Sequence, residues 1–512
     1  MTKTLLDQAQ NHIPKQDNNL DYKSFLKTFY TNVPKDDLAM MAPENLAYTA
    51  RTHLKLSHER KVGDAPAISI YTPTKKKEGW DGACTIIDIV NDDMAFLVDS
   101  VVAEVIRHNY QITVFIHPIL HAVRNSKGKV TDILADNKKD KTFAQSHIHI
   151  ELSRVISKEQ CEELKLGLES VLSDTRYANR DWEKMRQKLK DAHKIVDTAK
   201  AKTNTAMVAE YQDFLDYLYD NNFTLLGYRE YEFTYDKKSL KSKTIKGSSL
   251  GLLSDEIKPV YINEARKSLS EAQQKLRAEQ EPLTISKVNK RSTVHRRVPL
   301  DAISIKKYDK KGKAIGEVLF IGLFTSVTYS RSVTDIPYLR NKVENVIKQS
   351  KFAKSSHNHK AIRHILEKYP RDEILQMDSK LLYKHAISIL RLQERPHIAL
   401  YTRPDPFGRY ISCLVYVPRE KYETRLRLKF QHILEERLGG KCTNYKVSQD
   451  DSPLSRVLFQ IDINSLGKMP KFNEDKLELA LIEAGQNWPD RLRLTIEDKI
   501  TDHDEAARLI QR

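Results

Sequence analysis

Apolar and polar positions near the C-terminal end of the chain follow the order of a small module of strands and helices. Residues 409–417 are rich in β-branched and aromatic side chains, which favours a half-buried strand. The next stretch has apolar residues at helical spacing and ends at Gly439 and Gly440, as a helix does. Two strands, a helix and a final strand are then predicted at residues 442–447, 455–463, 472–486 and 491–496. The resulting βαββαβ order is that of a ferredoxin-like module.

A second module of the same kind is predicted in the first third of the chain. Strands are expected at residues 67–72, 85–90, 112–123 and 147–154, with helices at 94–108 and from residue 157 onward. The heptapeptides PAISIYT at Pro66 and PHIALYT at Pro396 each precede a turn, a strand and an amphipathic helix. They share Pro, Ile, Tyr and Thr, so we predict that the module is duplicated.

The remaining stretches predict a sheet-rich middle domain joined to both modules by helices. In its second half, strands are expected at residues 283–288, 293–298, 302–308 and 317–325. We therefore predict an α+β protein, in which two ferredoxin-like modules flank an antiparallel-sheet domain. Its parts are a helical segment 1–60 that docks on a later domain, a first module 61–180, a connector 181–204, a middle domain 205–345, a helical linker 346–395, a last module 396–500 and the start of a further helical segment 501–512.

The composition argues against several classes of protein. The chain has 512 residues, of which 40% are hydrophobic and 30% charged, as in soluble multidomain proteins. No apolar run approaches the ~20 residues of a membrane span, and the N-terminus lacks an apolar signal core, so we predict a cytoplasmic protein. The formal net charge is +16, but the densest basic patches, at 237–246 and 287–297, contain no aromatic residues for base stacking. A nucleic-acid partner is therefore not favoured.

Motifs for catalysis and for cofactor binding are missing from the sequence. It has no GxG turn for a dinucleotide, and no P-loop, HExxH or GxSxG motif. Gly439-Gly440-Lys441 weakly resembles a glycine-rich loop with an active-site lysine. Its place at the end of a predicted helix instead indicates a helix C-cap. We therefore predict no catalytic, cofactor-binding or metal-binding residues in this chain.

Histidines alternate on two strands that are expected to be neighbours. His147, His149 and Glu151 share one face of the strand at 147–154, and His117 and His121 alternate on the other strand. A two-strand histidine cluster could hold zinc. Same-face histidines on adjacent strands are more often exposed or satisfied within a core, so metal occupancy of the His147/His149 strand stays open.

Several long stretches resemble one family, the large bacterial NAD-dependent glutamate dehydrogenases. The likeness runs from about residue 20 to the C-terminus. It is carried by MAFLVDSV (94–101), NFTLLGYREY (222–231), STVHRRVPLD (292–301), FIGLFTSVTYSRSVTDIPYLRNKV (320–343), SHNHKAIRHILEKYPRDEI (356–374) and RPDPFGRYISCLVYVPREKY (403–422).

The resemblance implies a fold and a role. In that family the N-terminal half carries ACT-like modules, a PAS-like sheet domain and helical linkers. The full-length enzymes form homo-oligomers and convert L-glutamate, NAD and water to 2-oxoglutarate, ammonia and NADH. Because the likeness stops before the catalytic half, we expect a regulatory and assembly part that is inactive alone, with no cofactor of its own. Its catalytic half would act in cis or in trans. A free-standing amino-acid sensor or interaction module and a basic nucleic-acid binder are the alternatives.

An amino-acid effector is expected at the turns that join strands to helices, where free backbone N–H groups can hold a carboxylate. In the first module that turn contains three polar residues, and in the last module charged residues of the preceding hairpin lie close to it. The candidates are Asn91, Asp92, Asp93, Arg403, Asp405 and Arg409. The alternative functions are helix capping for the first three and structural ion pairing for Arg409.

Overall fold

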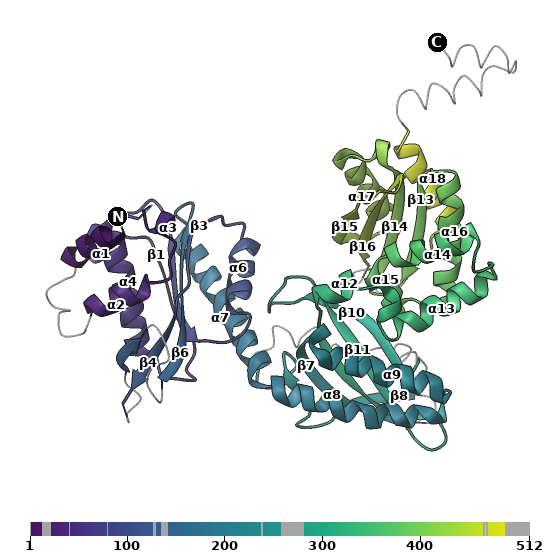
Figure 1. Cartoon of the computed structure of the whole chain (residues 1–512), viewed down its shortest axis with the longest axis horizontal. Coiled ribbons are helices and arrows are strands. Elements are labelled where there is room, and N and C mark those ends of the chain that lie inside the picture. The colour runs from purple at the N-terminus through teal and green to yellow at the C-terminus, as the bar shows by residue number, and fades with distance from the viewer. Residues whose placement is uncertain are drawn as a thin grey trace, which may run out of the picture.

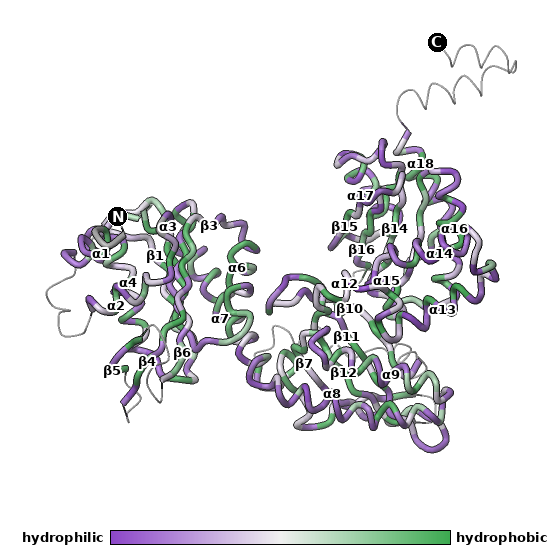
Figure 2. The backbone as a smooth tube through the Cα atoms, in the orientation of Figure 1, coloured by the Kyte–Doolittle hydropathy of each residue, from purple (hydrophilic) through white to green (hydrophobic). Residues whose placement is uncertain are grey.

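The computed structural model contains three antiparallel sheets, each with helices packed against it (Figure 1). It describes residues 2–12, 22–39, 41–78, 80–125, 130–134, 142–236, 239–257, 281–463, 466 and 469–486. The strand expected at 491–496 and the segment 501–512 lie outside the described residues. The strands of each sheet contain many of the apolar residues (Figure 2). No helix in these described ranges is long and apolar enough to span a membrane.

The first sheet has the order β1-β2-β6-β4-β5, and β3 also pairs with β6. The single strand expected at 112–123 is wrong, because Pro118 has no N–H to donate and divides it into β3 and β4. Both pieces still pair with β6. The strands are β1 (Ala67–Tyr71), β2 (Ile86–Asp92), β3 (Ile112–Ile116), β4 (Ile119–Arg124), β5 (Val130–Leu134) and β6 (Thr142–Leu152).

Helices cover both faces of this first sheet (Figure 1). Because side chains alternate along a strand, Ile87 and Ile89 of β2 pack toward one helical layer, whereas Asp88 faces the other. The segment before β1 is therefore one side of the domain's core. One layer consists of α6 (Leu97–Arg107) and α7 (Lys158–Arg180), and the other of α1 (Thr2–Ala9), η1 (Gln10–His12), α2 (Tyr22–Phe29), α3 (Lys35–Ala39) and α4 (Pro43–Glu59).

The middle domain is a twisted antiparallel sheet with the order β10-β11-β12-β7-β8, and β9 also pairs with β7. Helix α8 (Trp182–Asp197), which the sequence predicts as a connector, packs Met185 and Leu189 into the core of this domain. The other elements are α9 (Thr205–Tyr217), β7 (Phe223–Asp236), β8 (Ser239–Thr244), β9 (Leu250–Gly251), β10 (Leu283–Arg291), β11 (Pro299–Tyr308) and β12 (Ala314–Phe324).

Residues 293–298, expected as a strand, instead form a loop between β10 and β11, so that prediction is wrong. The hydroxyl of Ser292 accepts from the backbone N–H of Val294 and donates to its carbonyl, and His295 has a positive φ of 65°. The chain therefore turns here instead of continuing a ladder. The loop reaches the first domain, where Thr293 donates to the carboxylate of Asp174 on α7 (2.7 Å).

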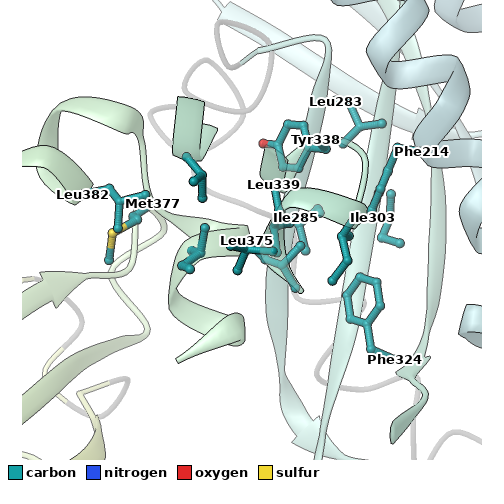
Figure 3. Packing of buried hydrophobic residues seen from close by; sticks show 14 of the residues in the cluster. Phe214, Leu283, Ile285, Ile303, Phe324, Tyr338, Leu339, Leu375, Met377 and Leu382 are labelled. Atoms are coloured by element: carbon teal, nitrogen blue, oxygen red, sulfur yellow. The ribbon is translucent and has the colours of Figure 1, made fainter. Parts of the chain in front are cut away.

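Helices link the middle sheet to the last sheet, and a continuous apolar cluster runs through all three parts. Phe324 of the middle sheet and Leu382 of the linker belong to this cluster (Figure 3). The linking helices are α12 (Ser326–Ser330), α13 (Leu339–Ser350), α14 (His357–Lys368), α15 (Arg371–Gln376) and α16 (Ser379–Glu394). The middle domain, the linker and the outer face of the last sheet therefore share one core.

The last module repeats the architecture of the first. Its sheet order is β13-β14-β16-β15, so β13 holds the edge beside β14, as β1 does beside β2. Tyr71 of PAISIYT lies opposite Ile86, and Tyr401 of PHIALYT lies opposite Leu414. Its elements are β13 (Ala399–Pro404), β14 (Tyr410–Pro418), α17 (Thr424–Leu438), β15 (Lys441–Ser448), β16 (Leu454–Asp462) and α18 (Glu474–Ala484). In both modules a helix precedes the edge strand and covers the outer face of the sheet.

We predict that Asp174 makes the stability of the chain depend on pH. Burial raises the pKa of this carboxyl to about 7, whereas an unfolded chain releases the proton near pH ~4. The native state therefore binds more protons than the unfolded state between these values, and stability falls as the pH rises through that window. Asp174→Asn should raise the free energy of unfolding at pH 8 by about 2–4 kcal/mol and change it little at pH 4.

Urea unfolding of both proteins at the two pH values measures this difference. Glu169→Gln, on the exposed side of the same helix, is the matched control and should change stability by less than about 0.5 kcal/mol at either pH. An equal effect of Asp174→Asn at both pH values would show that this carboxyl is ionised in the folded protein.

Candidate functional site

A cavity of about 380 Å³ lies where the middle sheet, α15 and the last sheet meet. Its size is in the range of small-molecule sites. Its lining carries four basic and three acidic side chains. The basic residues are Lys287, Arg296, Arg403 and Lys446, and the acidic ones are Asp301, Asp372 and Glu373. The cavity is therefore suited to a small ligand that bears charges of both signs.

Arg403 and Glu373, which both line the cavity, form a bidentate ion pair. Nε of Arg403 lies 2.6 Å from Oε2 of Glu373, and Nη2 lies 2.9 Å from Oε1. Both side chains are buried. Burial lowers the pKa of Arg403, but the Glu373 carboxylate outweighs this effect and holds the pKa above its usual range. The pair joins α15 to β13 across the linker boundary.

Lys287 of β10 also lines the cavity and bridges two carboxylates. Its Nζ lies 2.7 Å from Oδ1 of Asp301 and 2.9 Å from Oδ1 of Asp372. Tyr329 donates a hydrogen bond to Asp372 (3.0 Å). Burial raises the pKa of Asp301 to about 6, although Lys287 acts in the opposite direction. In this part of the lining one ammonium therefore faces two carboxylates.

Arg296 also lines the cavity. Its Nη2 donates to the carbonyl of Phe324 (2.6 Å). Its Nε is buried and has no partner among the described residues. A guanidinium in the lining of a cavity is a suitable partner for a carboxylate.

The structure brings only one of the predicted effector residues, Arg403, into this cavity. Asp405 and Arg409 pair with each other within the β13–β14 hairpin (2.7 Å), and Asp405 also accepts from the backbone N–H of Phe407. These two residues shape the turn and do not reach the lining.

Asn91, Asp92 and Asp93 lie in the first module, at the end of β2. Asp92 pairs with Arg60 (2.6 Å), which also donates to Asn91. None of the three caps α6, because this helix begins at Leu97, so the predicted capping role is wrong. Through Arg60, the polar turn instead forms hydrogen bonds that connect the C-terminal end of α4 to the sheet.

The sequence missed the acidic and basic partners that complete the cavity. Asp301 could have been predicted from the sequence as a site residue, because it interrupts an apolar strand and a buried carboxylate requires a partner. Its partners Lys287 and Asp372 come from β10 and α15, and no local pattern pairs them.

The predicted histidine cluster is only partly formed. His147 and His149 are fully buried on the face of β6 that α4 covers. His117 instead lies 2.5 Å from the hydroxyl of Ser146, and the close partner of His149 is Asp88 of β2. His53, Asp88 and His149 form a group whose donor atoms all lie within 4.8 Å of one another.

Comparisons with known proteins identify the modules. Residues 25–168 match the glutamate dehydrogenase ACT1 domain, residues 336–395 match its helical motif 1, and residues 399–489 match its ACT2 domain. The NAD-specific glutamate dehydrogenase of Halomonas elongata is 31% identical over 495 residues, which are 96% of this chain. The chain belongs to the NAD-specific glutamate dehydrogenase family.

Other relatives agree with this assignment. The NAD-specific glutamate dehydrogenase of Pseudomonas aeruginosa is 32% identical over 478 residues, and that of Mycobacterium tuberculosis is 22% identical over 461 residues. These matches cover 91% and 86% of the chain. The chain spans only 26–30% of the length of these three relatives and corresponds to their N-terminal part. The family resemblance predicted from the sequence is confirmed.

We predict that the Arg403–Glu373 pair holds the linker on ACT2. Glu373→Gln leaves the guanidinium buried without a counter-charge and should lower the free energy of unfolding by about 3–5 kcal/mol. The double variant Arg403→Met/Glu373→Leu removes both charges and should recover most of this loss. Urea unfolding measures both effects.

Glu420→Gln, at an exposed position after β14, is the control and should change stability by less than about 0.5 kcal/mol. A loss in the double variant as large as that in Glu373→Gln would mean that shape, and not charge pairing, stabilises this contact.

Proposed function

We propose that this chain is the regulatory and assembly part of a cytoplasmic NAD-dependent glutamate dehydrogenase, and that an amino acid binds in the cavity beside ACT2. The single observation that carries the effector assignment is the cavity's mixed charge at a three-way junction. Arg296 offers a guanidinium for a carboxylate, and the carboxylates around Lys287 offer a place for an ammonium group. A free amino acid carries both groups.

Catalysis is assigned to a separate half of the enzyme, in cis or in trans. Dinucleotide-binding folds are mostly parallel sheets with a glycine-rich turn. The strand pairs of the described residues are antiparallel in all three sheets. This contrast, together with the missing GxG motif, supports a division of labour in which this chain senses and assembles.

The middle domain fits a PAS-like role in this scheme. Its first and last strands, β7 and β12, lie side by side in the centre of the sheet, and helices α8 and α9 pack against it. A ligand that contacts this sheet, α15 and ACT2 together would stabilise one arrangement of the three parts. We propose that this arrangement is passed on to subunit contacts in a homo-oligomer.

Thermal unfolding in the presence of each of the twenty amino acids tests the effector assignment. At 100 times its Kd, an effector adds about 2.7 kcal/mol of stability, so at least one amino acid should raise Tm by several degrees. Arg296→Gln should abolish this shift, whereas Arg297→Gln, which alters the neighbouring residue outside the cavity lining, should preserve it. No shift with any amino acid, or an undiminished shift in Arg296→Gln, would contradict the site.

A direct assay tests the catalytic assignment separately. The purified chain with glutamate and NAD should produce no NADH above background. Clear glutamate-dependent turnover would refute the division of labour, whatever the result of the thermal panel.

A further inference from the structure

A fully buried group of ionisable side chains lies between α4 and the ACT1 sheet, far in sequence from the cavity residues. It consists of His53 from α4, Asp88 from β2 and His149 from β6, each with no solvent exposure of its side chain. Nε2 of His53 lies 3.1 Å from Oδ1 of Asp88, and Nδ1 of His149 lies 2.6 Å from the same oxygen. Three donor atoms from three elements thus converge on one point.

The surroundings of this group resemble the outer shell of a metal site. The second oxygen of Asp88 accepts a hydrogen bond from Tyr71 (2.9 Å). The second nitrogen of His149 faces Oε1 of Glu151 at 3.5 Å. Metal-bound histidines usually direct their other N–H to a carboxylate, and metal-bound carboxylates are themselves hydrogen-bonded. Asp88 and His149 therefore each have a neighbouring side chain that would orient them as ligands.

A third imidazole beside the group has no hydrogen bond among the described residues. His147 is fully buried, and neither of its ring nitrogens has a partner among the described residues. Its ring centroid lies 5.5 Å from that of His53, whose Nδ1 also has no partner within the described part of the chain. Buried polar groups without partners cost stability, so they require an explanation. The unpartnered nitrogens of His53 and His147 therefore make this buried region a candidate ligand site.

The duplicated module shows that the fold does not require this polar group. The strand registers align Asp88 with Tyr416, since each lies two positions beyond the residue opposite the shared tyrosine. They likewise align His149 with Arg456 and Glu151 with Leu458. ACT2 therefore covers the same face of its sheet without an imidazole–carboxylate–imidazole group, although its covering helix also carries a histidine, His385.

An ion pair between Asp88 and His149 is the simpler alternative. Burial lowers the pKa of His149, but the Asp88 carboxylate outweighs this effect and raises the pKa to about 9. Such a pair accounts for two of the residues. It does not account for the convergence of His53 on the same oxygen, and it leaves both ring nitrogens of His147 without a partner among the described residues.

We propose that His53, Asp88 and His149 bind one divalent transition-metal ion, for which Zn²⁺ is the best match, and that this ion fixes the N-terminal helices on the ACT1 sheet. Two imidazole nitrogens and a carboxylate oxygen are a common zinc donor set. Because the group is enclosed, the ion is structural. Its binding energy adds to the docking of α4, which supplies one ligand.

Metal analysis of the full chain, purified without chelators and dialysed against metal-free buffer, tests this site. One zinc per chain is expected after Zn²⁺ is added and the excess removed. Co²⁺ in its place should give the visible absorption of a low-coordinate cobalt site. Neither readout depends on enzymatic activity, and both use unmodified protein. Less than one tenth of an equivalent of either metal would overturn the proposal.

Variants locate the site. Asp88→Asn and His53→Gln should each weaken Zn²⁺ binding at least ~100-fold, more than the loss of an outer partner. His121→Gln, on β4 outside the group, should bind as the unmodified chain does. Circular dichroism shows whether each variant is folded. If a folded Asp88→Asn or His53→Gln chain bound zinc with undiminished affinity, the ion would lie elsewhere and the assignment would be wrong.

Discussion

The central strands of each ACT sheet are buried on both faces, and this constraint determines how the rest of the chain is arranged. Every residue of β14 is buried, and β2 is buried at all but its last position. A strand buried on both sides needs a packed layer on each side. The two helices that follow within a ferredoxin-like module supply only one layer. The other must come from outside the module, and in both copies it comes from the chain segment that precedes the edge strand.

The two copies meet this requirement in different ways. In ACT1 the N-terminal helices form the second layer and bring His53 against a polar strip of the sheet. In ACT2 the layer is α16 and its neighbours, which belong at the same time to the core of the middle domain. The middle sheet, the linker and ACT2 are held together because they share this core. The charged cavity lies at this junction, and its lining includes residues of all three parts.

The sequence predicted the local elements better than the contacts between them. The duplication was visible in PAISIYT and PHIALYT, because both peptides occupy equivalent edge strands. The strand expected at 293–298 was wrong, because Ser292 and His295 turn the chain into a loop that contacts α7. The pairing of Arg403 with Glu373 and of His53 with Asp88 joins residues 30 and 35 positions apart on separate elements, so no local periodicity reveals it.

The requirement for two covering layers is tested most directly by amide hydrogen exchange of the whole chain, followed by mass spectrometry. If α4 and α16 are integral layers, their amides open together with the strands beneath them. Peptides from these two helices should then exchange as slowly as those from β2 and β14. Exchange of α4 within seconds, while β2 and β6 remain protected for hours, would show that the sheet is stable without its outer layer and would contradict this account.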